Sequence, residues 1–296
     1  MLKKLIVILG PTASGKSELA VKIAKKFKWE IVSADSRQVY KGMDIGTGKI
    51  TKKEMKGIPH YLLDVASPKR RFTVVQYRKL ALKAIKTILK KNKIPILCGG
   101  TGFYIHAVVD GIVIPEVPPD WKLRKKLEKK SVEELYKILK KLDPKRAKTI
   151  EKKNKRRLIR ALEIVIKTKK PVPGLKKNPL PYPVLMLGIK KEKKELKKLI
   201  KKRFLKWLKQ GLIKEVENLR KSGLSWQKIE ELGIHYRVIA QYLQNKMNYK
   251  EMIEKSLKEL QNYAKRQMTW FKRDSGIRWL RNYKEAKKLI KEFLPS

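Results

Sequence analysis

A glycine-rich run near the N-terminus has the residue types and spacing of a phosphate-binding loop. It matches the pattern G-x-x-x-x-G-K-[ST] at every fixed position. The two glycines permit backbone conformations that strain other residues, so the loop N–H groups can surround an anion. We expect Lys16 to neutralise diphosphate oxygens and the Ser17 hydroxyl to face Mg²⁺. The chemistry predicted is therefore binding of a diphosphate, which need not be ATP. The predicted diphosphate-binding residues here are Gly10, Pro11, Thr12, Ala13, Ser14, Gly15, Lys16 and Ser17.

Two further segments carry polar residues directly after apolar runs. Asp35 follows the run 31–34, and Thr101 lies among the glycines of 99–102 after the run 94–98. In open α/β sheets ligands bind beyond the carboxyl ends of the strands, so both segments should face the phosphate loop. Asp35 would order Mg²⁺ or act as a general base, and Thr101 would offer a hydroxyl. The alternatives are a turn or helix-capping aspartate and a plain glycine turn.

These segments need a parallel sheet to bring them together. Short apolar, β-branched runs predict buried strands at 5–9, 30–33, 61–65, 94–98 and 184–189. Amphipathic spacing predicts helices at 17–27 and 74–91. Alternation of strands and helices predicts an α/β fold, a P-loop NTPase-like core with a mostly parallel sheet flanked by helices.

The sequence pattern changes from alternating strands and helices after Gly111. A linker containing several prolines is followed by residues 122–168, which are predicted to be helical and are strongly basic. A proline-rich loop then precedes the strand at 184–189. We therefore predict an inserted all-helical domain at 115–180, between core segments 1–114 and 181–296. Everything after Glu192 is predicted to be helical.

The composition predicts a polyanionic partner. Of 296 residues, 76 are Lys or Arg and 27 are Asp or Glu, giving a net charge of +49. With 42% hydrophobic residues the chain can bury a core, which excludes a disordered chain. Basic clusters at 155–160 and at Lys258, Lys265 and Lys272 suit a phosphate backbone. The alternative for part of the charge is a lysine-rich proteome.

The cysteine, histidine and hydropathy patterns argue against disulfides, zinc sites and membrane-spanning helices. The single cysteine, Cys98, excludes an internal disulfide and a cysteine-built zinc site. The three histidines lack metal-ligand spacing, and no apolar run reaches membrane length. We expect a soluble, cytoplasmic monomer that does not bind membranes.

Together these motifs resemble the tRNA dimethylallyltransferase family, also called tRNA isopentenyltransferases. The resemblance runs nearly end to end, and the phosphate loop combined with the Asp35 and Tyr263 segments makes it specific. One departure is Ile234-His235-Tyr236, where the family usually has a shorter Gly-Tyr reading. The segments that carry the resemblance are 10–17, 35–40, 42–47, 59–64, 99–102, 157–163, 203–204, 211–216, 233–237 and 263–270.

The resemblance implies prenyl transfer from dimethylallyl diphosphate to the exocyclic amine of the adenine 3′-adjacent to the anticodon. Asp35 would be the general base, Thr101 would bind near the reacting atoms, and Arg203 would grip the diphosphate. Mg²⁺ would be the cofactor, with Ser17 as its protein ligand. The inserted helices would clamp the anticodon stem-loop, and the adenine would flip out of its stack. The implied tRNA-binding residues are Asp35, Ser36, Arg37, Gln38, Thr101, Arg124, Arg156, Arg157, Leu158, Ile159, Arg160, Lys265 and Arg266.

Two other functions use the same loop. A small-molecule kinase would bind ATP there, but this hypothesis does not explain the basic residues on the helices. A non-catalytic RNA-binding module would only sense a nucleotide with it.

Overall fold

The computed structural model describes residues 3–112, 115, 117–174 and 176–294. The chain divides into two compact units, one formed by Met1–Gly111 with Pro179–Ser296 and the other by Ile112–Asn178. The insertion was predicted at 115–180, close to the second unit. The predicted boundary at residue 114 lies outside the described residues.

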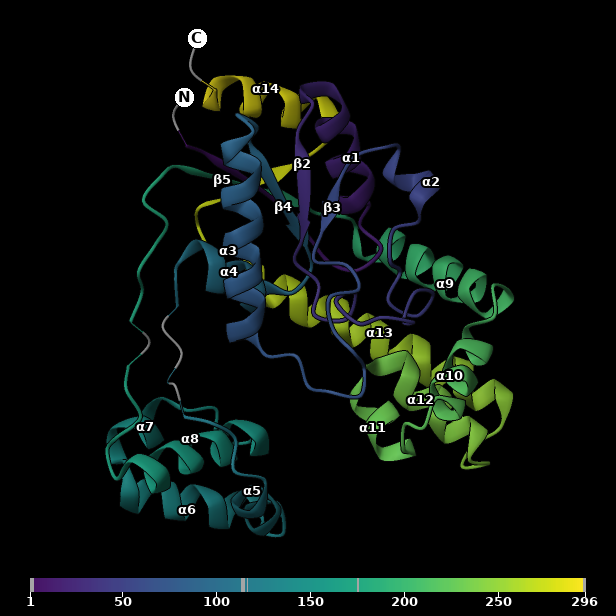
Figure 1. Cartoon of the computed structure of the whole chain (residues 1–296). Coiled ribbons are helices and arrows are strands. Elements are labelled where there is room, and N and C mark those ends of the chain that lie inside the picture. Colours follow the sequence, from purple (N-terminus) through teal and green to yellow (C-terminus); the bar gives the residue numbers. More distant parts are fainter. Residues whose placement is uncertain (1–2, 113–114, 116, 175, 295–296) are drawn as a thin grey trace. The chain divides into compact units, whose positions relative to one another are not determined.

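A single parallel sheet organises the described part of the larger unit (Figure 1). Its six strands lie in the order β3-β2-β4-β1-β5-β6. β1 is central and every one of its residues is buried, which explains its wholly apolar sequence. The predicted α/β fold is confirmed. The strands are β1 (Leu5–Leu9), β2 (Glu30–Ser33), β3 (His60–Tyr61), β4 (Pro95–Gly99), β5 (Val184–Ile189) and β6 (Ile277–Leu280).

Two expectations about strands were wrong. The C-terminal region was predicted to be helical throughout, but β6 pairs with β5 there. β6 is a four-residue edge strand in which Ile277 and Leu280 are buried, too short to show an alternating pattern. The strand predicted at 61–65 is only β3, because Leu62 and Asp64 adopt positive φ angles of 66° and 57° that end it.

Helices cover both faces of the sheet (Figure 1). Val7 and Leu9 point to the face covered by α3 and α4, and Ile6 and Ile8 point to the face covered by α1 and α14. Alternate residues of one buried strand thus feed two separate cores. The four helices are α1 (Lys16–Phe27), α3 (Val74–Lys90), α4 (Gly102–Val109) and α14 (Tyr283–Phe293).

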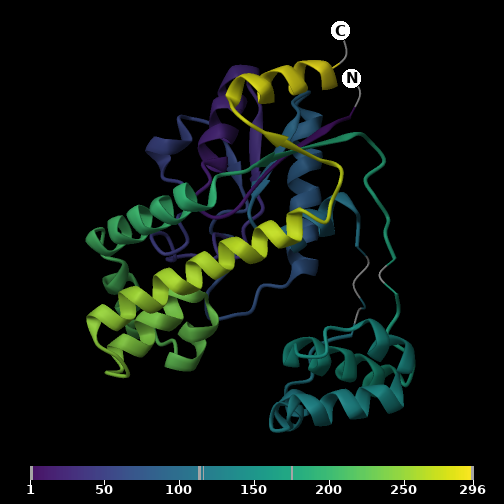
Figure 2. The same cartoon turned by 180° about the vertical axis from the view of Figure 1, so that it is seen from behind.

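Five further helices of this unit form a third core with the loop after β2. In Figure 2 the long α13, coloured yellow-green, runs from this helical cluster to the sheet. It packs against α4, α9 and α12. Side chains of α13 can therefore reach the carboxyl ends of the strands. The helices of this core are α9 (Lys193–Lys209), α10 (Leu212–Lys221), α11 (Trp226–Glu231), α12 (Ile234–Leu243) and α13 (Tyr249–Phe271). The short α2 (Lys52–Met55) has no buried residue and contacts α1.

The smaller unit is helical in its described residues and has a core of its own. A buried carboxylate, Glu163, supports this core. It accepts from Arg124 Nε and Nη2, each at 2.7 Å, and from Arg160. Paired in this way, a fully buried charge is tolerated. Its helices are α5 (Trp121–Glu128), α6 (Val132–Leu142), α7 (Pro144–Thr149) and α8 (Lys155–Thr168).

Candidate active site at the carboxyl end of the sheet

Three loops meet where β1, β2 and β4 end: the phosphate loop 10–17, the turn 35–38 and the glycine segment 99–102. The Thr101 N–H donates to the Ala34 carbonyl at 3.2 Å. A Cβ on Gly99 would lie 2.1 Å from the same carbonyl oxygen, so only glycine permits this approach. The predicted convergence of the three segments is therefore present in the structure.

The phosphate loop is shaped to receive an anion. Gly15 caps α1 with φ 88°, in the left-handed region, and provides no side-chain hydrogen bond to the first N–H groups. These N–H groups and the helix dipole favour a negative charge. The Ser14 hydroxyl is buried and has no hydrogen-bond partner among the described residues. A buried donor of this kind indicates a ligand oxygen.

Two cations converge on this loop. Arg203 of α9 donates to the Thr12 hydroxyl, and its guanidinium stacks 4.6 Å from the Trp207 ring centroid. Burial lowers the pKa of Arg203 to about 10. Burial and the neighbouring Arg203 charge also lower the pKa of Lys16. Two positive charges held together in a desolvated site call for a polyvalent anion such as diphosphate.

Asp35 lies on the turn after β2, near enough for its charge to act on both cations. Its Oδ1 accepts from the Arg37 N–H at 2.8 Å and the Gln38 N–H at 3.4 Å, so it does cap a turn. The turn role and a catalytic role are compatible, because the charge of Asp35 also reaches the site: it opposes the effect of burial on the pKa of Arg203 and adds to burial in raising the pKa of Tyr263. Thr101 Oγ1 accepts from the Ser36 N–H at 3.0 Å and joins the two loops.

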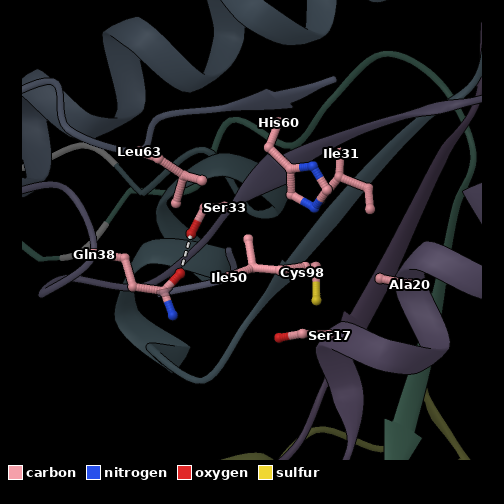
Figure 3. A pocket seen from close by; sticks show the side chains of 9 residues that line it. All are labelled: Ser17, Ala20, Ile31, Ser33, Gln38, Ile50, His60, Leu63 and Cys98. Atoms are coloured by element: carbon pink, nitrogen blue, oxygen red, sulfur yellow. Dashed lines mark hydrogen bonds between the residues drawn. The ribbon is translucent and has the colours of Figure 1, made fainter. Parts of the chain in front are cut away.

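A small pocket opens beside Ser17 (Figure 3). Ser33 and Gln38 line it and are joined by a 3.2 Å hydrogen bond, with His60 and Cys98 on the other walls. Its lining combines hydroxyl and amide groups with apolar side chains. The pocket thus offers neutral polar groups next to the hydroxyl predicted to face a metal.

The described residues contain no cluster of three or more His, Cys, Asp or Glu side chains that would hold a metal ion. Ser17 is exposed at the start of α1, and a single hydroxyl suits Mg²⁺, which retains several waters and uses one or two protein ligands with substrate phosphates.

Three site residues were not predicted. Tyr263 of α13 lies beside Thr101. Gln267 of α13 contacts two of the loops, and Glu215 of α10 anchors residues 44–46. The Glu215 carboxylate accepts three backbone N–H groups, from residues 44 to 46, at 2.7–3.0 Å. Gln267 carried a sequence signal, because it interrupts the apolar helical stripe between Ala264 and Phe271.

The predicted tRNA-binding residues fall into two groups. Ser36, Arg37, Gln38 and Thr101 lie in the site, and Lys265 and Arg266 are exposed on α13. The others belong to the smaller unit. There Arg156 and Arg157 are exposed, Arg124 and Arg160 pair with Glu163, and Leu158 and Ile159 are buried in the core, so their side chains do not reach the surface.

The departure at His235 falls behind Arg203 rather than on the surface. The ring is buried, stacked 5.7 Å from Phe204 and edge-on at 5.1 Å to Trp207. Burial and the Arg203 charge lower the pKa of His235 to about 3. A neutral imidazole therefore backs the helix face that presents Arg203.

Comparison with known proteins agrees with this geometry. Residues 38–274 match the family model described as IPP transferase. The chain is 41% identical to a tRNA dimethylallyltransferase of Acetivibrio thermocellus, over 97% of this chain and 95% of the relative. No described helix of the chain is both long and apolar enough to cross a membrane.

Solved structures share the fold. The crystal structure of a tRNA isopentenylpyrophosphate transferase from Bacillus halodurans matches with a TM-score of 0.73 and 35% identity, covering 98% of this chain and 95% of that one. A eukaryotic dimethylallyltransferase described as acting on tRNA matches with a TM-score of 0.74 and 27% identity, covering 91% and 70%. This chain belongs to the IPP transferase family.

Proposed function

We propose that this protein transfers a dimethylallyl group from dimethylallyl diphosphate to the N6 amine of the adenine 3′-adjacent to the anticodon of tRNA, releasing diphosphate. The observation that carries the proposal is the juxtaposition of a two-cation anion cradle with a carboxylate turn in one site. Family membership and the names of the relatives support the same substrate pair.

The donor half of the site would bind the diphosphate. The N-terminus of α1 and the unpartnered Ser14 hydroxyl would donate to its oxygens, and Lys16 and Arg203 would balance its charge. As the allylic C–O bond stretches, negative charge grows on the departing oxygen. Preorganised donors and cations at that position stabilise the transition state more than the ground state.

Mg²⁺ would be held by the Ser17 hydroxyl, and when bound it would neutralise part of the diphosphate charge. The hydroxyl and amide groups of Ser33 and Gln38 line the pocket beside Ser17 and would hydrogen-bond to water there. Within the described residues no carboxylate cluster competes for the ion.

The acceptor half would hold the adenine amine. Asp35 would accept the proton that the amine nitrogen loses as the new C–N bond forms. Thr101, tied to Ser36, would orient the reacting groups. One bond forms between the amine nitrogen and the allylic carbon, one C–O bond breaks, the proton goes to Asp35 and the bonding pair leaves with diphosphate.

An adenine stacked in the anticodon loop is inaccessible to a site at the end of a sheet. The base would therefore flip out of its stack, as in other enzymes that modify bases. The turn 35–38 would contact the tRNA at the site, and the exposed Arg156 and Arg157 of the smaller unit would contact its phosphates. That the protein acts as a monomer stays a prediction.

Transfer can be tested directly by incubating the protein with dimethylallyl diphosphate, Mg²⁺ and unmodified tRNA. We expect the tRNA to gain the mass of one five-carbon group, located by nuclease digestion and mass spectrometry on the adenosine next to the anticodon. A matched tRNA with guanosine at that position should gain nothing. An ATP-dependent product without any prenyl gain would instead support a kinase.

A further inference from the structure

Gln267 is a polar residue between apolar neighbours on the buried face of α13. The neighbouring buried positions on that face are Leu260, Ala264 and Phe271. Gln267 is only 6% exposed, so its amide is removed from water. Both ends of a buried amide need partners, or the fold loses the solvation of those groups. The partners found show what the residue does.

The amide of Gln267 joins two loops of the site. Its Oε1 accepts from the Thr12 N–H at 2.8 Å, in the phosphate loop, and its Nε2 donates to the Gly100 carbonyl at 2.8 Å. Only this orientation of the amide satisfies both partners. A Cβ on Gly100 would lie 2.4 Å from Nε2, so the absence of a side chain there makes room for the contact.

The connection continues to the carboxylate turn. Gly100 precedes Thr101, whose Oγ1 accepts from the Ser36 N–H at 3.0 Å, and the adjacent Asp35 caps that turn. A short series of hydrogen bonds thus runs from the loop that would hold the leaving group to the residue that would take the proton. Gln267 is the member that comes from a separate helix and bridges the two loops.

We infer that Gln267 is a positioning residue that fixes the spacing between the diphosphate loop and the Asp35–Thr101 turn. The inference rests on the proposed function, since it concerns the alignment of donor and acceptor in that reaction. Arg203 also contacts Thr12, but at the Thr12 side-chain hydroxyl, and in the proposed function it would bind the diphosphate as well. Gln267 instead contacts one loop with its amide oxygen and the other loop with its amide nitrogen.

The expected signature is a loss of turnover with little loss of donor affinity. Gln267 makes no hydrogen bond to Ser14, Lys16 or Ser17, so diphosphate should still bind. The reacting atoms would be misaligned, and a displacement of about 1 Å costs on the order of 10²-fold in rate. A residue that only stabilised the fold would not separate kcat from KM in this way.

The test compares Gln267→Met, which keeps the length of the side chain and removes both hydrogen bonds, with the wild type. We expect kcat to fall about 10- to 100-fold, while KM for dimethylallyl diphosphate and Kd for inorganic diphosphate with Mg²⁺ stay within about threefold. Gln261→Met, earlier on the same helix, is the matched control and should keep wild-type values. All rates are measured below the Tm of each variant.

Each result decides the inference. A kcat within threefold of wild type would overturn it, and so would a Kd for diphosphate that rises by the same factor as kcat falls. If Gln267→Met does not fold, Gln267→Asn replaces it, because it retains the amide but is one methylene too short for both loops. An inactive wild type would overturn the proposed function itself, whereas an active wild type with an unaffected variant overturns only the role of Gln267.

Discussion

At the scale of single residues, the site combines two cations with a carboxylate from a different loop. Lys16 and Arg203 lie at the phosphate loop, and burial lowers the pKa of both. Asp35 lies on the turn after β2, where backbone N–H groups hold its Oδ1. A leaving anion and a departing proton therefore have separate acceptors, as substitution at an allylic carbon by an amine requires.

Asp35→Asn should isolate the role of the carboxylate. The amide oxygen can still accept from the Arg37 N–H, so the turn and tRNA affinity should persist. Without a base, the single-turnover transfer rate should fall about 10²- to 10⁴-fold. Asp44→Asn, in the following loop, serves as the control and should transfer normally. A rate for Asp35→Asn near that of the wild type would rule out general-base catalysis by this residue.

At the scale of elements, two carboxylates hold loops and strands in place. Glu215 of α10 anchors residues 44–46 through three N–H groups and also accepts from the Tyr236 hydroxyl at 2.8 Å. Glu30, at the start of β2, accepts from Lys93 at 2.8 Å and from the Tyr61 hydroxyl at 2.7 Å. Such charge-assisted bonds connect elements distant in sequence.

Glu30 should make stability depend on pH. Burial alone would raise the pKa of Glu30, but Lys93, Tyr61 and Lys91 together lower it from 4.5 to about 2. Because the folded-state pKa is the lower one, the stabilisation is complete above the ordinary pKa and is lost as pH falls towards about 2. Glu30→Gln should therefore be less stable than the wild type at pH 7, and the difference should shrink in acid.

Urea unfolding at several pH values between neutrality and acid measures this difference. Glu18→Gln provides the control, since Glu18 forms an exposed pair with Lys22 and should contribute little at any pH. The wild type and Glu30→Gln could instead differ in free energy of unfolding by the same amount at all pH values. That result would show that the ionised Glu30 carboxylate does not provide the stabilisation.

At the scale of the whole molecule, the net charge of +49 exceeds what one diphosphate needs. Several phosphates of an RNA would account for more of it, through exposed residues such as Arg156 and Arg157 in the smaller unit. The rest of the lysine excess covers helices such as α14, where a biased composition is a sufficient explanation.

Binding of tRNA should weaken steeply as salt rises, because each neutralised phosphate releases counterions. The double variant Arg156→Gln/Arg157→Gln should reduce the slope of log K against log salt by about 0.7–0.9 for each phosphate that the protein no longer neutralises. Filter binding across salt concentrations gives these slopes. Lys284→Gln/Lys288→Gln on α14 removes the same charge and should leave the slope unchanged. Equal slopes for the two double variants would mean that charge acts without a defined contact surface.

The sequence by itself determined the parts of the site whose signal is local. The phosphate loop occupies consecutive residues between a buried strand and a helix, so spacing alone identifies it. Asp35 and the 99–102 segment follow from the rule that ligands bind at the carboxyl ends of parallel strands. The central strands were predictable because strands buried on both faces are continuously apolar.

Only the tertiary structure decided which distant residues complete that site. Gln267 meets Thr12 across 255 positions of the chain. Arg203 was expected from the family resemblance, but its contact with Thr12, across 191 positions, comes from the structure. The sequence around Tyr263 and the sequence around Glu215 do not predict which residues these side chains contact. Contacts of this kind depend on how α9, α10 and α13 pack against the end of the sheet, and packing geometry is a property of the whole fold, which no short stretch of sequence contains.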